Sequence, residues 1–169
     1  MLDDLLAAAR MQSGAIEMTD FDLAEIIGAV RTEALARATE RSVEVVTGLD
    51  PVLVRGDRRS LTRAVANLVE NAMRAAPDGS TVELGCGLVG HSAYVSVGDR
   101  GPGVDPGLVD GKRPTGGLGL SIVRDIATAH GGRLVSHARP DGGALMVMWL
   151  PEAGGDPVGD VPEPPLVRL

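Results

Sequence analysis

The stretch LTRAVANLVENAMRAAP, residues 61–77, carries the pattern that decides the fold. Its apolar side chains recur at helical spacing, which predicts a helix that packs one face against a sheet. Those side chains are Leu61, Val65, Leu68, Ala72 and Ala75. A separate narrow face carries Asn67, Asn71 and Arg74, at positions i, i+4 and i+7. Amide oxygens suit Mg²⁺ and a guanidinium suits phosphate, but an ordinary solvated helix face shows the same pattern.

Two glycine-rich segments follow this helix. VGDRGPGV, residues 97–104, places Asp99 at the end of a predicted strand, before Gly101 and Gly103. A carboxylate there can accept a hydrogen bond from an adenine amino group, and glycines let the backbone approach a ligand closely. TGGLGLSIV, residues 115–123, is a glycine loop that opens a helix, whose first N–H groups can bind phosphate. Taken alone, each segment is also typical of a common turn.

The remaining pattern predicts helices that alternate with strands. Helices are expected over residues 2–13, from a cap at Thr19, Asp20 or Asp22 to about Arg41, from Asp57 to Pro77, and over 118–130. Strands are expected at 42–48, 52–56, 81–89, 93–99, 133–138 and 144–150. Residues 152–169 are rich in proline and acids, which predicts a disordered tail. This order predicts an α+β fold with helices on one face of a sheet.

Composition limits the possible functions. The 169 residues suggest one domain, and the net charge of −7 argues against a nucleic-acid or anionic-membrane surface as the main partner. The single cysteine, Cys86, excludes an internal disulfide and fits a reducing compartment. No apolar run reaches the roughly 20 residues of a membrane span. We therefore expect a cytoplasmic domain without direct membrane insertion.

The three segments, in this order, resemble the catalytic and ATP-binding domain of sensor histidine kinases, within the Bergerat-fold (GHKL) ATPases. NLVENAMRAAP (67–77) resembles the N box of that family, DRGPG (99–103) its G1 box and GGLGLSIV (116–123) its G2 box. LLAAARMQSGAIEMTDFDLAEII (5–27) resembles the stretch that joins the dimerisation hairpin to the ATPase domain. The resemblance covers roughly residues 1–151.

This resemblance implies a two-layer α/β sandwich, with a mixed, mostly antiparallel sheet and about three helices on one face. Residues 1–41 would form the end of the dimerisation hairpin and a linker helix, and 42–151 the ATP-binding domain. The implied cofactors are ATP and Mg²⁺.

The resemblance also implies a role for individual residues. Asn71 would hold Mg²⁺, Asn67 would assist the metal or the phosphates, and Arg74 would contact phosphate. Asp99 would recognise adenine. The residues that would shape the pocket and its phosphate end are Gly101, Gly103, Gly117, Leu118, Gly119 and Leu120. Lys112 and Arg113, between the glycine segments, could reach the terminal phosphates as catalytic groups or simply be solvated.

The chain departs from the family pattern in its lid and in its histidines. The lid between Gly103 and Gly117 is short and contains no phenylalanine, so the F box is absent. None of the three histidines lies in the helical His-Glu setting that the family phosphorylates. We therefore expect the phosphoacceptor histidine on a separate partner protein or a missing domain, which passes the phosphoryl group to a response regulator. The initial Met1 and the proline-rich end favour the ATP-binding half of a split kinase over an excised piece.

Three other functions stay open. A Bergerat-fold ATPase that hydrolyses ATP would place a general-base glutamate four residues before Asn71, where this chain has Asn67, and Glu70 points about 100° away from Asn71. A protein-serine kinase of the anti-sigma type is also small, although the linker-like residues 1–30 argue against it. A module that binds nucleotide without catalysis is the third.

Overall fold

The computed structural model describes residues 2–5, 17–105 and 118–163. The elements follow in chain order as β1 Thr19–Asp22, α2 Leu23–Glu40, β2 Glu44–Leu49, β3 Leu53–Gly56, α3 Arg58–Ala75, β4 Thr81–Val89, β5 Ser92–Gly98, α5 Leu118–Ala129, β6 Arg133–Ala138 and β7 Ala144–Pro151. Residues 2–5 are helical, and the rest of the helix predicted over 2–13 lies outside the described residues.

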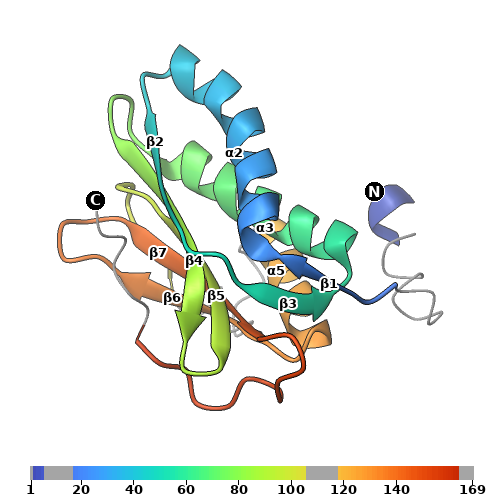
Figure 1. Ribbon diagram of the computed structural model, residues 1–169. Helices are drawn as coiled ribbons and strands as arrows, with labels where there is room; N and C mark the ends of the chain where they lie inside the picture. The colour runs from blue at the N-terminus through green and yellow to red at the C-terminus, as the bar shows by residue number, and fades with distance from the viewer. Residues whose placement is uncertain (1, 6–16, 106–117, 164–169) are drawn as a thin grey trace.

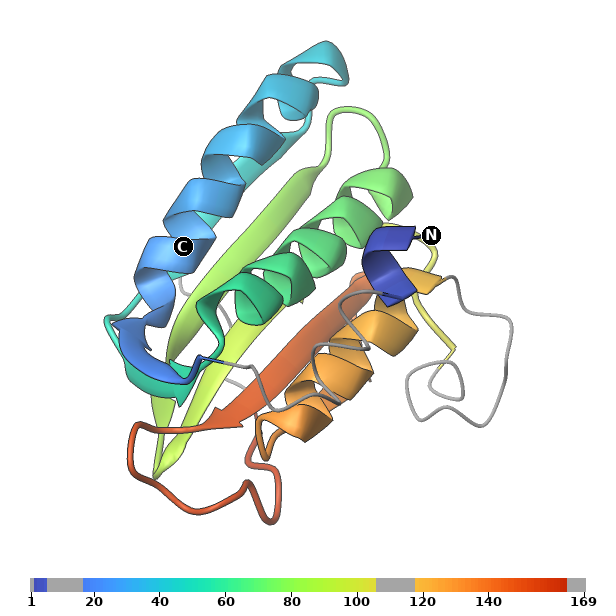
Figure 2. The same cartoon turned by 90° about the vertical axis from the view of Figure 1, so that its right-hand side faces the viewer.

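One mixed sheet forms the first layer of the molecule (Figure 1). Its five strands lie in the order β2-β4-β5-β7-β6, with β2 parallel to β4 and every other pair antiparallel. Helices α2, α3 and α5 cover one face of it (Figure 2). The predicted α+β sandwich with a mostly antiparallel sheet is therefore confirmed. None of the helices in the described residues is long and apolar enough to cross a membrane.

The first strand was not predicted from the sequence. Thr19–Asp22 pairs antiparallel with β3 in a separate two-stranded sheet, where Phe21 lies opposite Val54. Only Phe21 of these four residues is buried, so the segment has too little apolar alternation to signal a strand. Asp22 ends the strand and caps α2, because its carboxylate accepts a hydrogen bond from the Ala24 N–H at 2.9 Å.

The main core lies between the helices and the sheet. Every member of the predicted apolar stripe of α2 is buried, namely Leu23, Ile26, Ile27, Val30, Ala34 and Ala38. The predicted stripe of α3 is buried too, except that Ala75 is only half-buried. Full burial of one large aliphatic side chain stabilises a fold by about 1.5–3 kcal/mol, so these stripes fix both helices on the sheet.

The opposite face of the sheet carries a second, smaller apolar cluster. Side chains alternate along a strand, so Tyr94, Val147 and Trp149 point away from the helices. The chain beyond β7 covers this cluster, since Val158 is 9% exposed and its N–H donates to the Gly131 carbonyl at 2.8 Å. The prediction of a disordered tail is therefore wrong for residues 152–163. The proline and acid content of this segment predicted disorder, because the few apolar side chains that anchor it form no regular pattern.

Candidate functional site

The helix α3 is fixed at its N-terminus by a cap and a histidine. Asp57 accepts a hydrogen bond from the Arg59 N–H at 3.2 Å, as an N-cap residue does. The Nε2 atom of His130 accepts the Asp57 N–H at 3.1 Å, while Nδ1 lies 2.7 Å from the Ile126 carbonyl. This pattern requires the neutral tautomer with its proton on Nδ1. His130 is therefore a structural link between α5 and α3.

Arg41 fixes the other end of α3. Its guanidinium donates to the carbonyls of Met73 at 2.5 Å and Ala76 at 2.7 Å, which complements the negative end of the helix dipole. The same end of α3 meets the loop after β5. A Cβ on Gly101 would lie 2.5 Å from the Ala75 carbonyl oxygen, so only glycine allows this approach.

A cavity of about 650 Å³ opens along the polar face of α3. It brings together seven of the residues predicted from the sequence, namely Asn67, Asn71, Arg74, Gly103, Leu118, Gly119 and Leu120. The other lining residues are Asp4, Arg63, Glu70, Val104, Asp105 and Ile122. The lining therefore comes from α3, the loop after β5, the start of α5 and the N-terminal segment.

The two asparagines lie in the middle of this cavity wall. Both side chains are half-buried. Neither side-chain amide makes a hydrogen bond to another of the residues that the structure describes. Arg74 is more exposed, at 75% of its side chain, and its guanidinium lies 3.4 Å from a Glu70 carboxylate oxygen. The wall thus presents two amides and one exposed cation, groups that can meet a metal ion and phosphate oxygens.

Asp99 lies directly after β5 and is only 1% exposed. Its carboxylate accepts the Gly101 N–H at 2.8 Å. Burial raises the pKa of the Asp99 carboxyl above its ordinary value, although hydrogen bonds from the Gly101 and Ala144 backbones and the charge of Arg139 lower it. Asp99 and Gly101 do not line the cavity themselves. The same loop continues to Gly103, which does line it, with a positive φ of 89° that favours glycine.

Sequence reasoning missed Arg63 and Glu70 as members of the site. Around the helix axis, the lining residues of α3 span about 100°, and Glu70 lies at one edge of that arc with Asn71 at the other. Glu70 therefore points away from Asn71, as expected, and still lines the cavity. Extending the i, i+4 spacing one step back from Asn67 would have found Arg63. Asp4 has no local signal, because only the fold brings it to its ion pair with Arg63.

The charges around the cavity are mixed. Arg63 and Arg74 are opposed by Asp4, Glu70 and Asp105, so the described lining carries no excess of positive charge. The described residues also contain no group of three His, Cys, Asp or Glu side chains that could hold a metal ion.

Three further predicted residues, Lys112, Arg113 and Gly117, lie outside the described residues. Their roles stay predictions from the resemblance.

Comparison with known proteins gives a consistent result. The family model for histidine kinase-, DNA gyrase B-, and HSP90-like ATPases matches residues 56–154. The sensor protein CutS of Streptomyces coelicolor is 32% identical over 166 residues, which cover 89% of this chain and 40% of CutS. The catalytic domain of histidine kinase ThkA superposes with a TM-score of 0.74 at 26% identity, covering 81% of this chain and 98% of that domain. Full-length ShkA in complex with AMPPNP gives a TM-score of 0.73 at 26% identity, covering 92% of this chain and 36% of ShkA.

These matches concern a part of each relative. The chain spans only 18–41% of the length of the curated relatives that it matches. The matched ThkA structure, by contrast, is a catalytic domain that the chain covers almost completely. The resemblance predicted from the sequence is confirmed at the level of this domain.

Proposed function

Because this chain belongs to the family of histidine kinase-, DNA gyrase B- and HSP90-like ATPases, we propose that it binds Mg²⁺·ATP and transfers the γ-phosphoryl group to a histidine. The acceptor would lie on a dimerisation hairpin in a separate partner protein or domain. That hairpin would then pass the phosphoryl group to a response regulator. The observation that carries the proposal is the single cavity in which Asn67, Asn71 and Arg74 face the start of α5.

Each side chain has a role that its chemistry allows. The Asn71 amide oxygen would complete the Mg²⁺ shell, with Asn67 beside it on the metal or the phosphates. Arg74 would donate charge-assisted hydrogen bonds to phosphate oxygens. The N–H groups at the start of α5 would receive the phosphate end, as free donors in a first helical turn can. Asp99 would accept a hydrogen bond from the adenine amino group.

The reaction itself asks little covalent chemistry of the protein. An imidazole nitrogen of the acceptor attacks the γ-phosphorus, a P–N bond forms, the bond to the bridging oxygen breaks and ADP leaves. Positioning and charge stabilisation account for most of the catalysis in phosphoryl transfer. The amides of Asn67 and Asn71, the Arg74 guanidinium and a bound Mg²⁺ would supply both.

The histidines of the chain itself are poor acceptors. Both ring nitrogens of His130 are engaged with backbone groups, and His137 lies within β6. His91 is in the turn between β4 and β5, with Nδ1 2.5 Å from a Glu152 oxygen. None of them lies on a helix that could present its ring to the cavity, which supports an acceptor elsewhere.

One observation favours a second candidate function, which is ATP hydrolysis. The Glu70 carboxylate lines the cavity, and a carboxylate there could take a proton from water. Its exposed pairing with Arg74 and its place at the edge of the α3 face argue against an aligned general base. We therefore rank hydrolysis below transfer to histidine.

The test is transfer from γ-labelled ATP to a separately expressed dimerisation hairpin that carries its histidine. We expect label on the hairpin that is stable to base and lost in acid, and no label when that histidine is replaced by glutamine. Acid-stable label would indicate a serine kinase, and steady release of phosphate without protein label would indicate an ATPase. Nucleotide binding without either product would indicate a binding module.

A further inference from the structure

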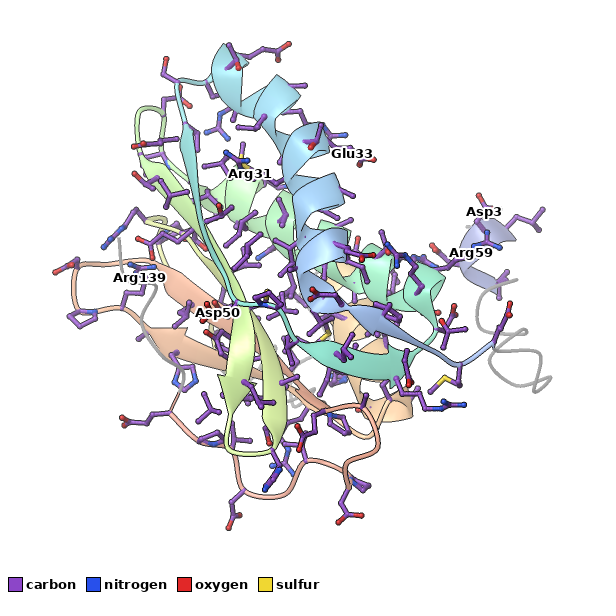
Figure 3. All side chains as sticks on the ribbon, in the orientation of Figure 1. Asp3, Arg31, Glu33, Asp50, Arg59 and Arg139 are labelled. Atoms are coloured by element: carbon purple, nitrogen blue, oxygen red, sulfur yellow. The ribbon has the colours of Figure 1, made fainter. Side chains whose placement is uncertain are left out.

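A buried ion network lies beside the loop that carries Asp99. Glu83 on β4 is 4% exposed, and it is paired with two arginines. Arg139 donates from Nη1 and Nη2 to its two carboxylate oxygens at 2.8 and 3.0 Å, and Arg100 donates to one of them at 3.0 Å. Arg139, labelled in Figure 3, comes from the turn between β6 and β7. Arg100 also reaches Asp141 in that turn at 3.3 Å. The network thus joins β4 to the loop after β5 and to the turn between β6 and β7.

The end of β5 packs closely against this network and against the turn between β6 and β7. Glu83 pairs in register with Gly98, and a Cβ on Gly98 would lie 2.3 Å from the Arg139 Nη1 atom. On the turn side, a Cβ on Gly143 would lie 2.1 Å from the Asp99 carbonyl oxygen. Because Gly98 and Gly143 have no Cβ, the Arg139 guanidinium and the backbone of the turn can pack directly against the end of β5.

A network of this kind is a costly way to stabilise a fold. Taking charged groups out of water costs free energy that their attraction often fails to recover, and apolar residues of similar size are frequently as stable. Hydrogen-bonded ion pairs do, however, define geometry tightly, because a bidentate arginine fits a carboxylate in one plane. The arrangement therefore suits a site where position matters more than stability.

The network also acts on the charge of Asp99. Burial favours the protonated acid, while the positive charge of Arg139 favours the carboxylate and lowers the pKa of Asp99. Glu83 in turn holds Arg139 beside the β5 end. One buried glutamate thereby influences both the place of the Asp99 carboxylate and its ionisation.

We propose that Glu83 is a positioning residue for base recognition: through Arg100 and Arg139 it holds Asp99 where its carboxylate selects a purine with a 6-amino group. The inference rests on the proposed function, because it takes the purine of ATP as the group that Asp99 meets. A carboxylate accepts from the 6-amino group of adenine and repels the 6-oxo group of hypoxanthine. One charged hydrogen bond corresponds to a preference of about 10- to 100-fold.

The experiment measures the dissociation constants of Mg²⁺·ATP and Mg²⁺·ITP for the wild-type chain, E83Q and D20N. E83Q keeps the size of the side chain and removes its charge. D20N makes the same carboxylate-to-amide change in the exposed pair of Asp20 with Arg55, 3.4 Å apart, and serves as the matched control. We expect the ratio of the ITP dissociation constant to the ATP dissociation constant to fall about tenfold in E83Q and to stay unchanged in D20N.

If the role of Glu83 is merely structural, E83Q should weaken the binding of both nucleotides equally. An unchanged ratio of the two dissociation constants in folded E83Q therefore overturns the proposal. If E83Q does not fold, R139K replaces it, because lysine keeps the positive charge but cannot make both hydrogen bonds to the Glu83 carboxylate. The ratio of the ITP to the ATP dissociation constant should then fall about two- to fivefold, and an unchanged ratio in R139K also overturns the proposal. A wild-type chain that binds neither nucleotide contradicts the proposed function itself.

Discussion

Replacing Asp99 by asparagine separates what this residue does for binding from what it does for stability. The substitution is nearly isosteric, and its amide oxygen can still accept the Gly101 N–H that Asp99 accepts at 2.8 Å. The remaining amide nitrogen is a donor, which would face the donor amino group of adenine. The loop therefore keeps its internal hydrogen bond, while the group that faces the base changes from a hydrogen-bond acceptor to a donor.

The loss of affinity follows from a single charged hydrogen bond. Such a bond contributes roughly 1.5–3 kcal/mol, and 1.4 kcal/mol is about a factor of ten in affinity. D99N should therefore bind Mg²⁺·ATP about 10- to 100-fold more weakly. The phosphate contacts of α3 are untouched, so binding should weaken by this amount and not vanish entirely.

The effect on stability should have the opposite direction. Burial raises the pKa of Asp99 above its ordinary value of 3.8, so the folded state holds this proton more tightly than the unfolded state. The free energy of unfolding therefore falls as the pH rises from that ordinary value through the raised pKa. Above the raised pKa the full cost of the buried charge is present. At neutral pH, D99N should unfold at a higher temperature than wild type, and the difference should shrink on acidification.

Calorimetric titration with Mg²⁺·ATP and thermal unfolding without nucleotide, both as a function of pH, measure the two effects. A D99N chain that binds ATP as tightly as wild type would refute the role of Asp99 in base recognition, and one that is less stable at neutral pH would refute the cost of burying its charge. D20N again controls for a carboxylate-to-amide change that touches neither the loop nor the cavity.

Three further substitutions test the roles of Asn71, His130 and Val158. N71A should weaken ATP binding about tenfold and make the residual affinity insensitive to Mg²⁺ removal by a chelator, since the amide oxygen would be a metal ligand; a full Mg²⁺ dependence in this variant would contradict that role. H130A leaves the Asp57 N–H without its acceptor, which costs about 1–3 kcal/mol and should lower Tm by roughly 2–12 °C. An unchanged Tm in H130A would show that the link from α5 to α3 is not structural. V158D should release the chain beyond β7 from the sheet face that lies opposite the helices. Acrylamide should then quench the fluorescence of Trp149, the only tryptophan, more strongly than in wild type. Equal quenching in V158D and wild type would contradict the packing of this segment on the sheet.

The sequence predicted most of the architecture because the apolar patterns are regular. The stripe of α2 and the cap at Asp57 follow from helical spacing and N-cap chemistry, and both were found as expected. The residues 19–22 could not be predicted as a strand, since that pairing depends on Val54 opposite Phe21. Order in residues 152–163 depends likewise on contacts that composition does not reveal.

The site divides in the same way. Asn67, Asn71 and Arg74 share a face by helical geometry alone, so sequence spacing was enough to group them. The ion network of Glu83 could not be foreseen, because Arg100 reaches it from the loop after β5 and Arg139 from the turn between β6 and β7, 56 residues away in sequence. Tertiary contacts of this kind carry no local pattern.

The most direct test of the central claim is a crystal structure of the chain with Mg²⁺ and a non-hydrolysable ATP analogue. The adenine amino group should lie at about 3 Å from the Asp99 carboxylate. The metal should lie on the Asn71 amide oxygen, and the phosphates between α3 and the start of α5. A nucleotide bound with its base away from Asp99, or with no contact to Asn71, would contradict the proposed function.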